Sequence, residues 1–309
     1  MIQIITLNPA MDRTLTLDEL LPGNVLRATQ VVSMAGGKGI NVARFLKQLA
    51  REIEIEVIGF SGGATGGYIQ NECEQMGVTG KFIDISAPNR VCFTILEPDR
   101  TTVINEPGPV ISQDELLQFW NVLKESQLPD VVLLSGSAPP GIPDNFYADV
   151  IRYYKGFDLP VFLDTSAGYL AEGIRAEPFF VKPNESEFRE LINLKEGSFE
   201  ELVVAAQQFI NYGVQNMAIS FGERGLVYVT GDGGPFYIPA LKIKAVNPIA
   251  SGDAFMAGMI YSMTNGGDME YSLKFATAAA AMNAVNSVPS FSNPEDIKDW
   301  ALKVEKYNL

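Results

Sequence analysis

The sequence predicts an α/β protein, a three-layer α/β/α sandwich whose mostly parallel central sheet is covered by helices on both faces. Short, almost entirely apolar runs such as 131–134 and 161–164 alternate with amphipathic helical segments, as strands do in a buried parallel sheet. Segments 14–32 and 90–105 alternate apolar and polar residues instead and do not fit such a sheet. We expect them to form a small separate β-sheet inserted into the first half of the chain.

The expected elements are separated by turns rich in Gly, Pro, Asn and Asp. In the first half they are strands at 2–7, 14–17 and 25–32, a helix that follows 35–41 and runs to Leu49, a strand at 54–60, a helix after 61–67, and a hairpin of 91–97 with 101–105. In the second half they are strands at 131–134, 161–164, 179–181, 217–221 and 226–230, with helices after Pro143, from Asn184 to Leu191, and from Ala250 onward.

Composition limits the possible partners. A chain of 309 residues has room for one large α/β domain or two domains. Its hydrophobic content of 47% and charged content of 19% allow a sizeable core. The net charge of −14 and the pI of about 4.5 argue against nucleic acid and acidic membranes as partners, so an anionic substrate needs local Lys and Arg.

The chain contains no His, which excludes Ser-His-Asp triads, Cys-His dyads and His-ligated metals. Any general base must therefore be Asp, Glu, Lys, Tyr or Cys. Cys73 and Cys92 are too few for a disulfide scaffold and indicate a reducing compartment. The first residues lack a basic region and a long apolar run, and no segment is long enough to cross a bilayer, so we expect a cytoplasmic protein.

Glycine-rich or small-residue turns recur at 35–41, 61–67, 222–225 and 250–253, where strands end or helices begin. In a parallel sheet such turns gather at the carboxyl edge, where ligands bind. The sequence has no GxxxxGK[ST] phosphate loop and no GxGxxG with an acidic residue at the distance of a dinucleotide fold.

Residues 247–260, NPIASGDAFMAGMI, are the most informative of these segments. A small-residue turn leads into a helix that Ser251 can cap, with Phe255, Met256, Met259, Ile260 and Met263 at helical spacing. The N-terminus of a helix attracts anions, and Asp253 lies in its first turn. A carboxylate beside an anion site suits the removal of a proton from a hydroxyl that attacks a phosphoryl group. An Asp in a first helical turn is also a common structural choice.

The motifs together resemble those of the PfkB (ribokinase-like) sugar kinases, in the branch of 1-phosphofructokinase and tagatose-6-phosphate kinase. The resemblance covers almost the whole chain, because NPAMD at 8–12, AGGKGINVAR at 35–44, SGSAPPG at 135–141, VKPNESE at 181–187, SFGERG at 220–225 and NPIASGD at 247–253 occur in the family's order. One departure is Ala250, where the family usually has Gly.

The resemblance implies a role for residues at each motif. Asp253 would be the base, and the backbone N–H groups of Ala250, Ser251, Gly252 and Asp253 would hold the transferred phosphoryl group. Asp12, Gly37, Asn41 and Ser137 would contact sugar hydroxyls, and Arg27, Lys38 and Arg90 would hold the phosphate already on the sugar. ATP would be bound by Lys182, Asn184, Ser220, Gly222, Gly225 and Asn286, and Mg²⁺ by Asn184 and Glu187, in part through water.

By resemblance, the reaction would be ATP-dependent phosphorylation of a ketohexose monophosphate, foremost fructose 1-phosphate to fructose 1,6-bisphosphate. Residues 1–11, 34–81 and 108–309 would form the core, and 12–33 and 82–107 a lid through which a homodimer forms. Other acceptors are tagatose 6-phosphate and fructose 6-phosphate. Less favoured alternatives are a simple-sugar or nucleoside kinase and a non-catalytic sugar-phosphate sensor.

Each site residue also has a structural explanation. Asp12 could cap a turn, Glu187 could be a solvated helix residue, and Asn286 could be an ordinary polar residue at a helix end. Arg27 and Arg90 could be edge-strand charges that block aggregation.

Overall fold

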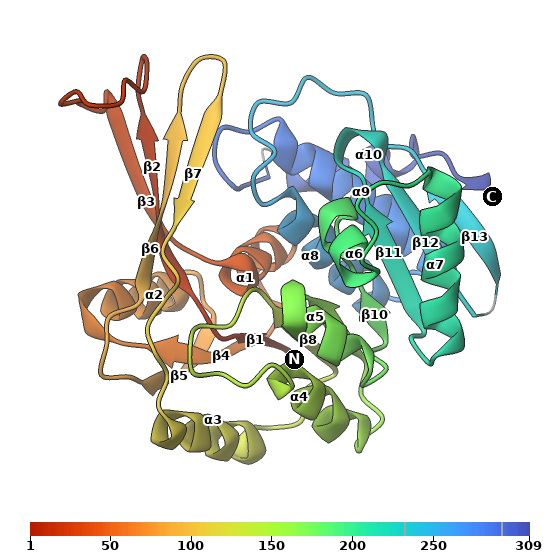
Figure 1. The fold of residues 1–309 in the computed structure, drawn as a ribbon, viewed down its shortest axis with the longest axis horizontal. Coiled ribbons are helices and arrows are strands. Elements are labelled where there is room, and N and C mark those ends of the chain that lie inside the picture. Colours follow the sequence, from red (N-terminus) through yellow and green to blue (C-terminus); the bar gives the residue numbers. More distant parts are fainter. Residues whose placement is uncertain (232, 292) are drawn as a thin grey trace.

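The computed structural model, which describes residues 1–231, 233–291 and 293–309, contains a large sheet with helices on both faces and a smaller sheet that extends away from it (Figure 1). The expected fold class is therefore confirmed. No helix within the described residues combines the length and the apolar character needed to cross a membrane.

The large sheet is parallel over most of its width. Its strands in spatial order are β14 (Tyr307–Asn308), β13 (Gly233–Ile238), β12 (Leu226–Thr230), β11 (Asn216–Ser220), β10 (Phe180–Val181), β9 (Val161–Asp164), β8 (Val131–Ser135), β1 (Ile2–Thr6), β4 (Ile55–Ser61) and β5 (Thr79–Asp84). From β11 to β5 neighbouring strands pair in parallel, and β12, β13 and β14 add antiparallel pairs at one edge.

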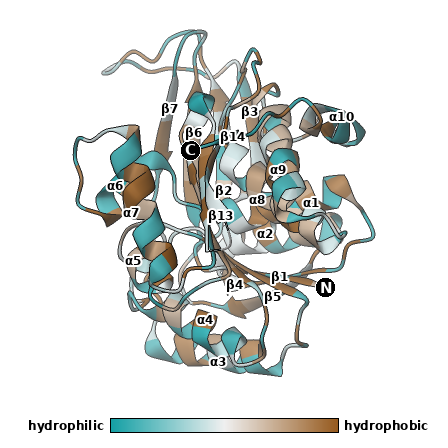
Figure 2. Cartoon of the chain, turned by 90° about the vertical axis from the view of Figure 1, so that its right-hand side faces the viewer, coloured by the Kyte–Doolittle hydropathy of each residue, from teal (hydrophilic) through white to brown (hydrophobic). Residues whose placement is uncertain are grey.

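Helices cover both faces of this sheet. One layer contains α1 (Lys38–Leu49), α2 (Gly63–Gln75), α8 (Ser251–Thr264), α9 (Met269–Ala284) and α10 (Ile297–Ala301). The other contains α3 (Gln113–Glu125), α4 (Phe146–Lys155), α5 (Ala167–Ile174), α6 (Glu185–Leu191) and α7 (Phe199–Asn211). Figure 2 shows α5, α6 and α7 on one side of the sheet and α1, α8 and α9 on the other.

The apolar strands are explained by this double cover. In β1, Ile4 belongs to the hydrophobic core beneath α1 and α8, whereas the next residue, Ile5, belongs to the core beneath α3 and α4. Leu133 and Leu134 of β8 divide in the same way. A strand buried on both faces needs apolar residues at every position, which is why 131–134 and 161–164 were recognisable as strands.

The smaller sheet has the order β3 (Gln30–Gly36), β2 (Ala10–Thr16), β6 (Arg90–Leu96) and β7 (Thr101–Asn105). The strand predicted at 25–32 is displaced toward the C-terminus, because residues 25–29 lie outside any strand and Val25 is 90% exposed. The later end of this strand is explained by Gly36, which we expected to lie in a turn. Gly36 is still in β3, where a Cβ atom would lie 1.9 Å from the Asp12 carboxylate of β2, so only glycine allows the strands to continue to this point.

The strand bounds differ slightly from the predicted ranges of the core and the lid. Residues 82–84, placed in the lid range 82–107, belong to β5 of the large sheet. The small sheet in turn begins at Ala10 and includes residues to Gly36. The division into core and lid stays a prediction.

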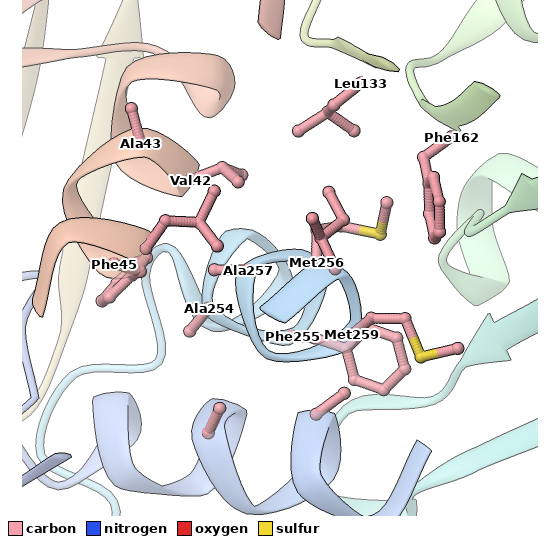
Figure 3. Close-up of a cluster of buried hydrophobic side chains, with 14 of the residues drawn as sticks. Val42, Ala43, Phe45, Leu133, Phe162, Ala254, Phe255, Met256, Ala257 and Met259 are labelled. Atoms are coloured by element: carbon pink, nitrogen blue, oxygen red, sulfur yellow. The ribbon is translucent and has the colours of Figure 1, made fainter. Parts of the chain in front are cut away.

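Helix α8 is buried on nearly all sides rather than along one face. Every residue from Asp253 to Ile260 is buried, because α8 packs against α1, α9 and the sheet. Figure 3 shows Met256 directed toward Leu133 of β8, with Ala254 and Ala257 toward α1. The core thus fixes the position of the α8 N-terminus at the edge of the sheet.

Candidate active site

The ends of neighbouring strands bring together side chains that are distant in the sequence. Asp164 is the last residue of β9, Lys182 follows β10, and Lys38 begins α1. Asp253 lies in the first turn of α8. These charged groups face one another at the carboxyl edge of the parallel strands, where ligands bind in open α/β sheets.

Asp253 is only 5% exposed, and its Oδ2 accepts a hydrogen bond of 2.9 Å from Nδ2 of Asn41. Burial raises the pKa of Asp253 to about 7, and the nearby Asp164 carboxylate acts in the same direction. The charges of Lys38 and Lys182 and the hydrogen bond from Asn41 oppose this rise. A carboxylate with a pKa near neutrality is suited to general base catalysis.

The start of α8 has the features of an anion site. Ala250 precedes the helix in the left-handed conformation, with φ of 62°, and no side chain caps this end. Gly252 lies close to Lys182, because a Cβ atom on Gly252 would be 3.3 Å from the Lys182 ammonium nitrogen. A helix N-terminus and an ammonium group therefore converge beside Asp253.

Ser251 does not cap α8 as predicted, because Ala250 occupies the capping position. The Ser251 hydroxyl instead accepts a hydrogen bond of 3.0 Å from Asn283 of α9. The same Asn283 amide donates to the Ile249 carbonyl, at 2.8 Å. Asn283 and Asn247, whose amide donates to the Ser287 carbonyl, thus anchor the turn to the end of α9. We did not predict either anchor, since each bond joins segments at least one helix apart.

Lys38 lies at the Asp253 side of the site. Its ammonium group is 2.8 Å from Oδ1 of Asp164 and 3.8 Å from Oε1 of Glu187. Burial alone would lower the pKa of Lys38, but the carboxylates of Asp164, Glu187 and Asp253 raise it. Lys38 is therefore held as a cation. The structure does not bring it together with Arg27, which is exposed in the loop before β3.

Asp164 is a site residue that the sequence analysis missed. It is wholly buried, and although burial would raise its pKa, Lys182 and Lys38 lower it. Its Oδ2 has no hydrogen-bond partner and lies 3.5 Å from the Lys182 ammonium nitrogen. The strand predicted at 161–164 ends at this residue, which places Asp164 at the carboxyl edge of the sheet. That position was the one indication in the sequence that Asp164 could belong to the site.

A second group of residues lies where the small sheet meets the large one. Burial raises the pKa of Asp12 on β2, while the charges of Arg44 and Arg90 and the Gly37 N–H lower it. Gly37, with φ of 89°, makes the turn from β3 into α1. Arg90 donates to the backbone carbonyls of Asn8 and Glu106, at 3.1 and 3.2 Å. Ser137 joins this group through Asn8, whose amide lies 3.4 Å from the Ser137 hydroxyl.

Asn184 and Glu187 form the capping box of α6. The Asn184 side chain accepts from the Glu187 N–H at 2.9 Å, and Oε2 of Glu187 accepts from the Asn184 N–H at 2.8 Å. Glu187 is thus not a freely solvated helix residue. Within residues 1–231, 233–291 and 293–309, no group of three His, Cys, Asp or Glu side chains could hold a metal ion.

The glycines of 220–225 have backbone conformations that suit a loop close to a ligand. Gly222 begins the short helix η1 (Gly222–Arg224) with φ of 60° and open space around it, whereas Gly225, with φ of 98°, packs against the Ile238 carbonyl. Ser220 pairs with Asn184 as an isolated bridge, which joins this loop to the start of α6. The Asn286 amide donates to the carbonyls of Met282 and Ser290, so it stabilises its own turn.

Comparisons with known proteins agree with this geometry. Residues 4–296 match the family described as "pfkB family carbohydrate kinase". The chain is 34% identical over 285 residues to a 1-phosphofructokinase of Borreliella burgdorferi, with 92% of each chain covered. It is 32% identical to a tagatose-6-phosphate kinase of Staphylococcus epidermidis, with 99% of each covered. Phosphofructokinase-2 of Escherichia coli has the same fold, with a TM-score of 0.91, 22% identity and 98% of each chain covered.

The fold is therefore ribokinase-like, and the protein is an ATP-dependent sugar kinase. The chain belongs to the pfkB family of carbohydrate kinases.

Proposed function

We propose that this kinase phosphorylates fructose 1-phosphate at C6 to give fructose 1,6-bisphosphate, with Asp253 as the general base. The observation that carries this proposal is the juxtaposition of Asp253, with its pKa of about 7, and the α8 N-terminus beside Lys182. The similarity to a 1-phosphofructokinase supports the choice of acceptor. The presence of both a buried carboxylate and neighbouring cations argues against a non-catalytic sensor, which needs no base.

In the proposed reaction Asp253 takes the proton of the C6 hydroxyl as its oxygen attacks the γ-phosphorus of ATP. The bond from that phosphorus to the β,γ-bridging oxygen breaks, and ADP leaves. The N–H groups of Ala250, Gly252 and Asp253 would donate to the transferred group, and Lys182 would neutralise its charge. The Ser251 N–H donates to the Pro248 carbonyl at 3.2 Å, so it would join them only as a shared donor. Lys38, held charged beside Asp164, supplies a further cation near Asp253.

ATP is proposed to bind over Lys182, Asn184, Ser220, Gly222 and Gly225, with Asn286 shaping the turn at the adenine end. Mg²⁺ fits next to Glu187, because Oε1 is not used by the capping box and Mg²⁺ needs few protein ligands when phosphate and water supply the rest. The side-chain amide oxygen of Asn184 accepts a hydrogen bond from the Glu187 N–H, so it would bind Mg²⁺ only through its second lone pair. Mg²⁺ would neutralise the charge of the ATP phosphates.

The acceptor is proposed to lie between the two sheets. Asp12, Gly37, Asn41 and Ser137 would bind its hydroxyls, and Arg90 its phosphate. Arg27 is exposed in the loop before β3 and Lys38 is paired with Asp164, so the three predicted cations do not converge on this phosphate. Lys38 contacts Asp164 on the Asp253 side of the site. It would therefore act as a charge close to the transferred phosphoryl group and not as a ligand of the acceptor's own phosphate. Tagatose 6-phosphate is the second candidate, because the similarity to a tagatose-6-phosphate kinase extends over 99% of the chain.

The test is an ADP-release assay with ATP, Mg²⁺ and a panel of fructose 1-phosphate, fructose 6-phosphate, tagatose 6-phosphate, fructose, ribose and adenosine. We expect the highest kcat/KM with fructose 1-phosphate. A higher value with tagatose 6-phosphate or fructose 6-phosphate would change the acceptor, and no activity with any sugar phosphate would refute the proposal.

We also propose that the small sheet is a lid and that two copies of the protein pair through it. Phe93 and Ile104 are paired across β6 and β7, on the face opposite to Asp12, and Ile104 is 53% exposed. Leu15 and the half-exposed Val31 lie on that same face. An apolar face of this kind favours association. Light scattering that gives a monomer mass at assay concentrations would refute the dimer.

The expected cytoplasmic location is likewise a proposal. It is supported by two buried free cysteines, Cys73 and Cys92, and by the need for ATP. Cell fractionation that finds the protein outside the cytoplasm would refute it.

A further inference from the structure

Arg44 of α1 connects the two halves of the proposed site. It lies one helical turn after Asn41, and its Nη1 donates to Oδ1 of Asn41 at 2.8 Å. Its Nη2 donates to the carbonyl of Ala35 in β3, two residues before the Gly37 turn. The Asn41 Nδ2 group then donates to Asp253 at 2.9 Å. A single guanidinium is therefore bonded to both the amide partner of Asp253 and the strand that pairs with Asp12.

The chemistry of these groups fixes the direction of each hydrogen bond. A guanidinium can only donate, so it must meet the oxygen end of the Asn41 amide. The NH₂ end of the amide is then left to face Asp253, and an ionised carboxylate can only accept. Without Arg44, the amide could rotate and present its oxygen to Asp253, and that contact is favourable only when Asp253 is protonated.

We propose that Arg44 is a positioning residue for phosphoryl transfer, which holds the Asn41 amide in the one orientation that supports ionised Asp253. This inference rests on the function proposed above, in which Asp253 is the base. Arg44 also supports the acceptor side, because its charge acts on the partly buried Asp12 carboxylate. Its loss should therefore weaken both proton removal and acceptor binding, and leave ATP binding unchanged.

Other charged groups around these residues are accounted for. Arg44 faces Asp12 of β2 and Glu72, Cys73 and Tyr68 of α2. Asp253 faces Asp164, Lys38 and Lys182, none of which hydrogen-bonds to Arg44. The route from Arg44 to Asp253 by hydrogen bonds thus passes through Asn41, and a double-mutant cycle can isolate it.

The experiment measures kcat and KM between about pH 6 and 9 for wild type, Arg44→Met, Asn41→Ala and the double variant, with thermal melting to verify folding. For Arg44→Met we expect a loss of roughly tenfold or more in kcat at neutral pH. We also expect the acid limb of its pH–kcat profile, where Asp253 becomes protonated, to move to higher pH. KM for the sugar phosphate should rise, and KM for ATP should stay within about twofold. Combined with Asn41→Ala, the same change should no longer move the acid limb. Arg51→Met, in the exposed turn that follows the same helix, is the control for loss of charge and should leave kinetics unchanged.

Two results would overturn the inference. One is an Arg44→Met enzyme whose acid limb coincides with that of wild type, whatever its absolute rate. The other is a shift of the acid limb by Arg44→Met that is equally large in the wild-type background and in the Asn41→Ala background. If Arg44→Met does not fold, Arg44→Lys takes its place. Lys keeps the charge but lacks the forked donors of the guanidinium, so a smaller shift in the same direction is expected, and no shift overturns the inference. A wild type without activity on any sugar phosphate would instead refute the proposed function itself.

Discussion

At the residue scale, Asp253 combines the two properties that a base for hydroxyl activation needs. It is buried next to an anion site, and its pKa of about 7 leaves it ionised in a large fraction of molecules at neutral pH while still able to hold a proton. We expect Asp253→Asn to lower kcat by roughly 10²–10⁴-fold, with little change in nucleotide affinity. Steady-state kinetics and calorimetric titration with an ATP analogue test this, and turnover near the wild-type value would exclude Asp253 as the base.

The raised pKa of Asp253 also predicts how stability depends on pH. Its folded pKa of about 7 exceeds the ordinary aspartate pKa of 3.8, so between these two pH values the folded state holds a proton that the unfolded state has lost. The contribution of Asp253 to stability is therefore largest below about pH 4 and is lost as pH rises through about 7. Asp253→Asn should raise the melting temperature relative to wild type at pH 8 more than at pH 5. An equal difference at both pH values would contradict the raised pKa.

Ala250 stands where the resemblance to the family leads us to expect Gly, and its backbone conformation disfavours a Cβ atom. With φ of 62° Ala250 is in the left-handed region, which costs about 1 kcal/mol for a residue with a Cβ atom. Its side chain is partly buried against the core beneath α8, which offsets a similar amount. We expect Ala250→Gly to change the free energy of unfolding by less than about 1 kcal/mol and to preserve kcat, because the N–H groups remain in place.

Ala250→Val provides the contrast. A β-branched residue is much less tolerated at positive φ, so this change should lower the free energy of unfolding by about 2 kcal/mol or more. Urea denaturation of the two variants and the wild type measures both effects. Equal stability of Ala250→Val and wild type would mean that the turn relaxes out of the left-handed conformation.

At the element scale, α6 shows how a helix start serves two purposes. Glu187 closes the capping box of α6 and points its other oxygen toward Lys38. We expect Glu187→Gln to raise the Mg²⁺ concentration that gives half-maximal rate, because a carboxylate binds Mg²⁺ far better than an amide. Its effect on stability should stay below about 1 kcal/mol, since Gln can also close a capping box.

The chain contains a matched control for this prediction. Glu201 closes the capping box of α7 in the same way, with Ser198 as its partner, and lies outside the site. Glu201→Gln should alter stability to a similar extent and leave the Mg²⁺ titration unchanged. If the two variants have the same Mg²⁺ dependence as wild type, Glu187 acts only as a cap.

Elements differ in how well the sequence predicted them, and the reasons are physical. The strands of the large sheet were found because burial on both faces demands unbroken apolar runs. The end of the strand predicted at 25–32 was placed too early, because Gly36, which suggested a turn, allows β3 to continue beside Asp12. At the site, Lys38 lies beside Asp164 and its charge acts on Asp253, whereas we expected it with Arg27 and Arg90 at the acceptor's phosphate. Asp164, Arg44 and Asn283 were missed, because their partners are defined by packing and not by local spacing.

At the scale of the whole molecule, a net charge of −14 repels a sugar phosphate, although salt screens this beyond about 8–10 Å. Binding must then come from cations at the site. Arg90 is well placed for this, because the strand register puts it on the same face of the small sheet as Asp12, at the junction with the large sheet. Its guanidinium already bonds to two backbone carbonyls, which hold it in position.

We therefore expect Arg90→Ala to raise KM for fructose 1-phosphate by roughly tenfold or more, the range for losing a charge-assisted hydrogen bond, with a much smaller effect on KM for ATP. Arg90→Lys should show a smaller defect, because Lys keeps the charge but not the paired geometry. Arg51→Ala is the control for loss of an arginine charge, since Arg51 is exposed in the turn that follows α1 and lies outside both the site and the small sheet. Steady-state kinetics of these variants on the sugar panel test whether Arg90 binds the acceptor's phosphate. Comparable activity on free fructose, or an Arg90→Ala enzyme impaired only toward ATP, would show that the acceptor's phosphate is not what Arg90 holds.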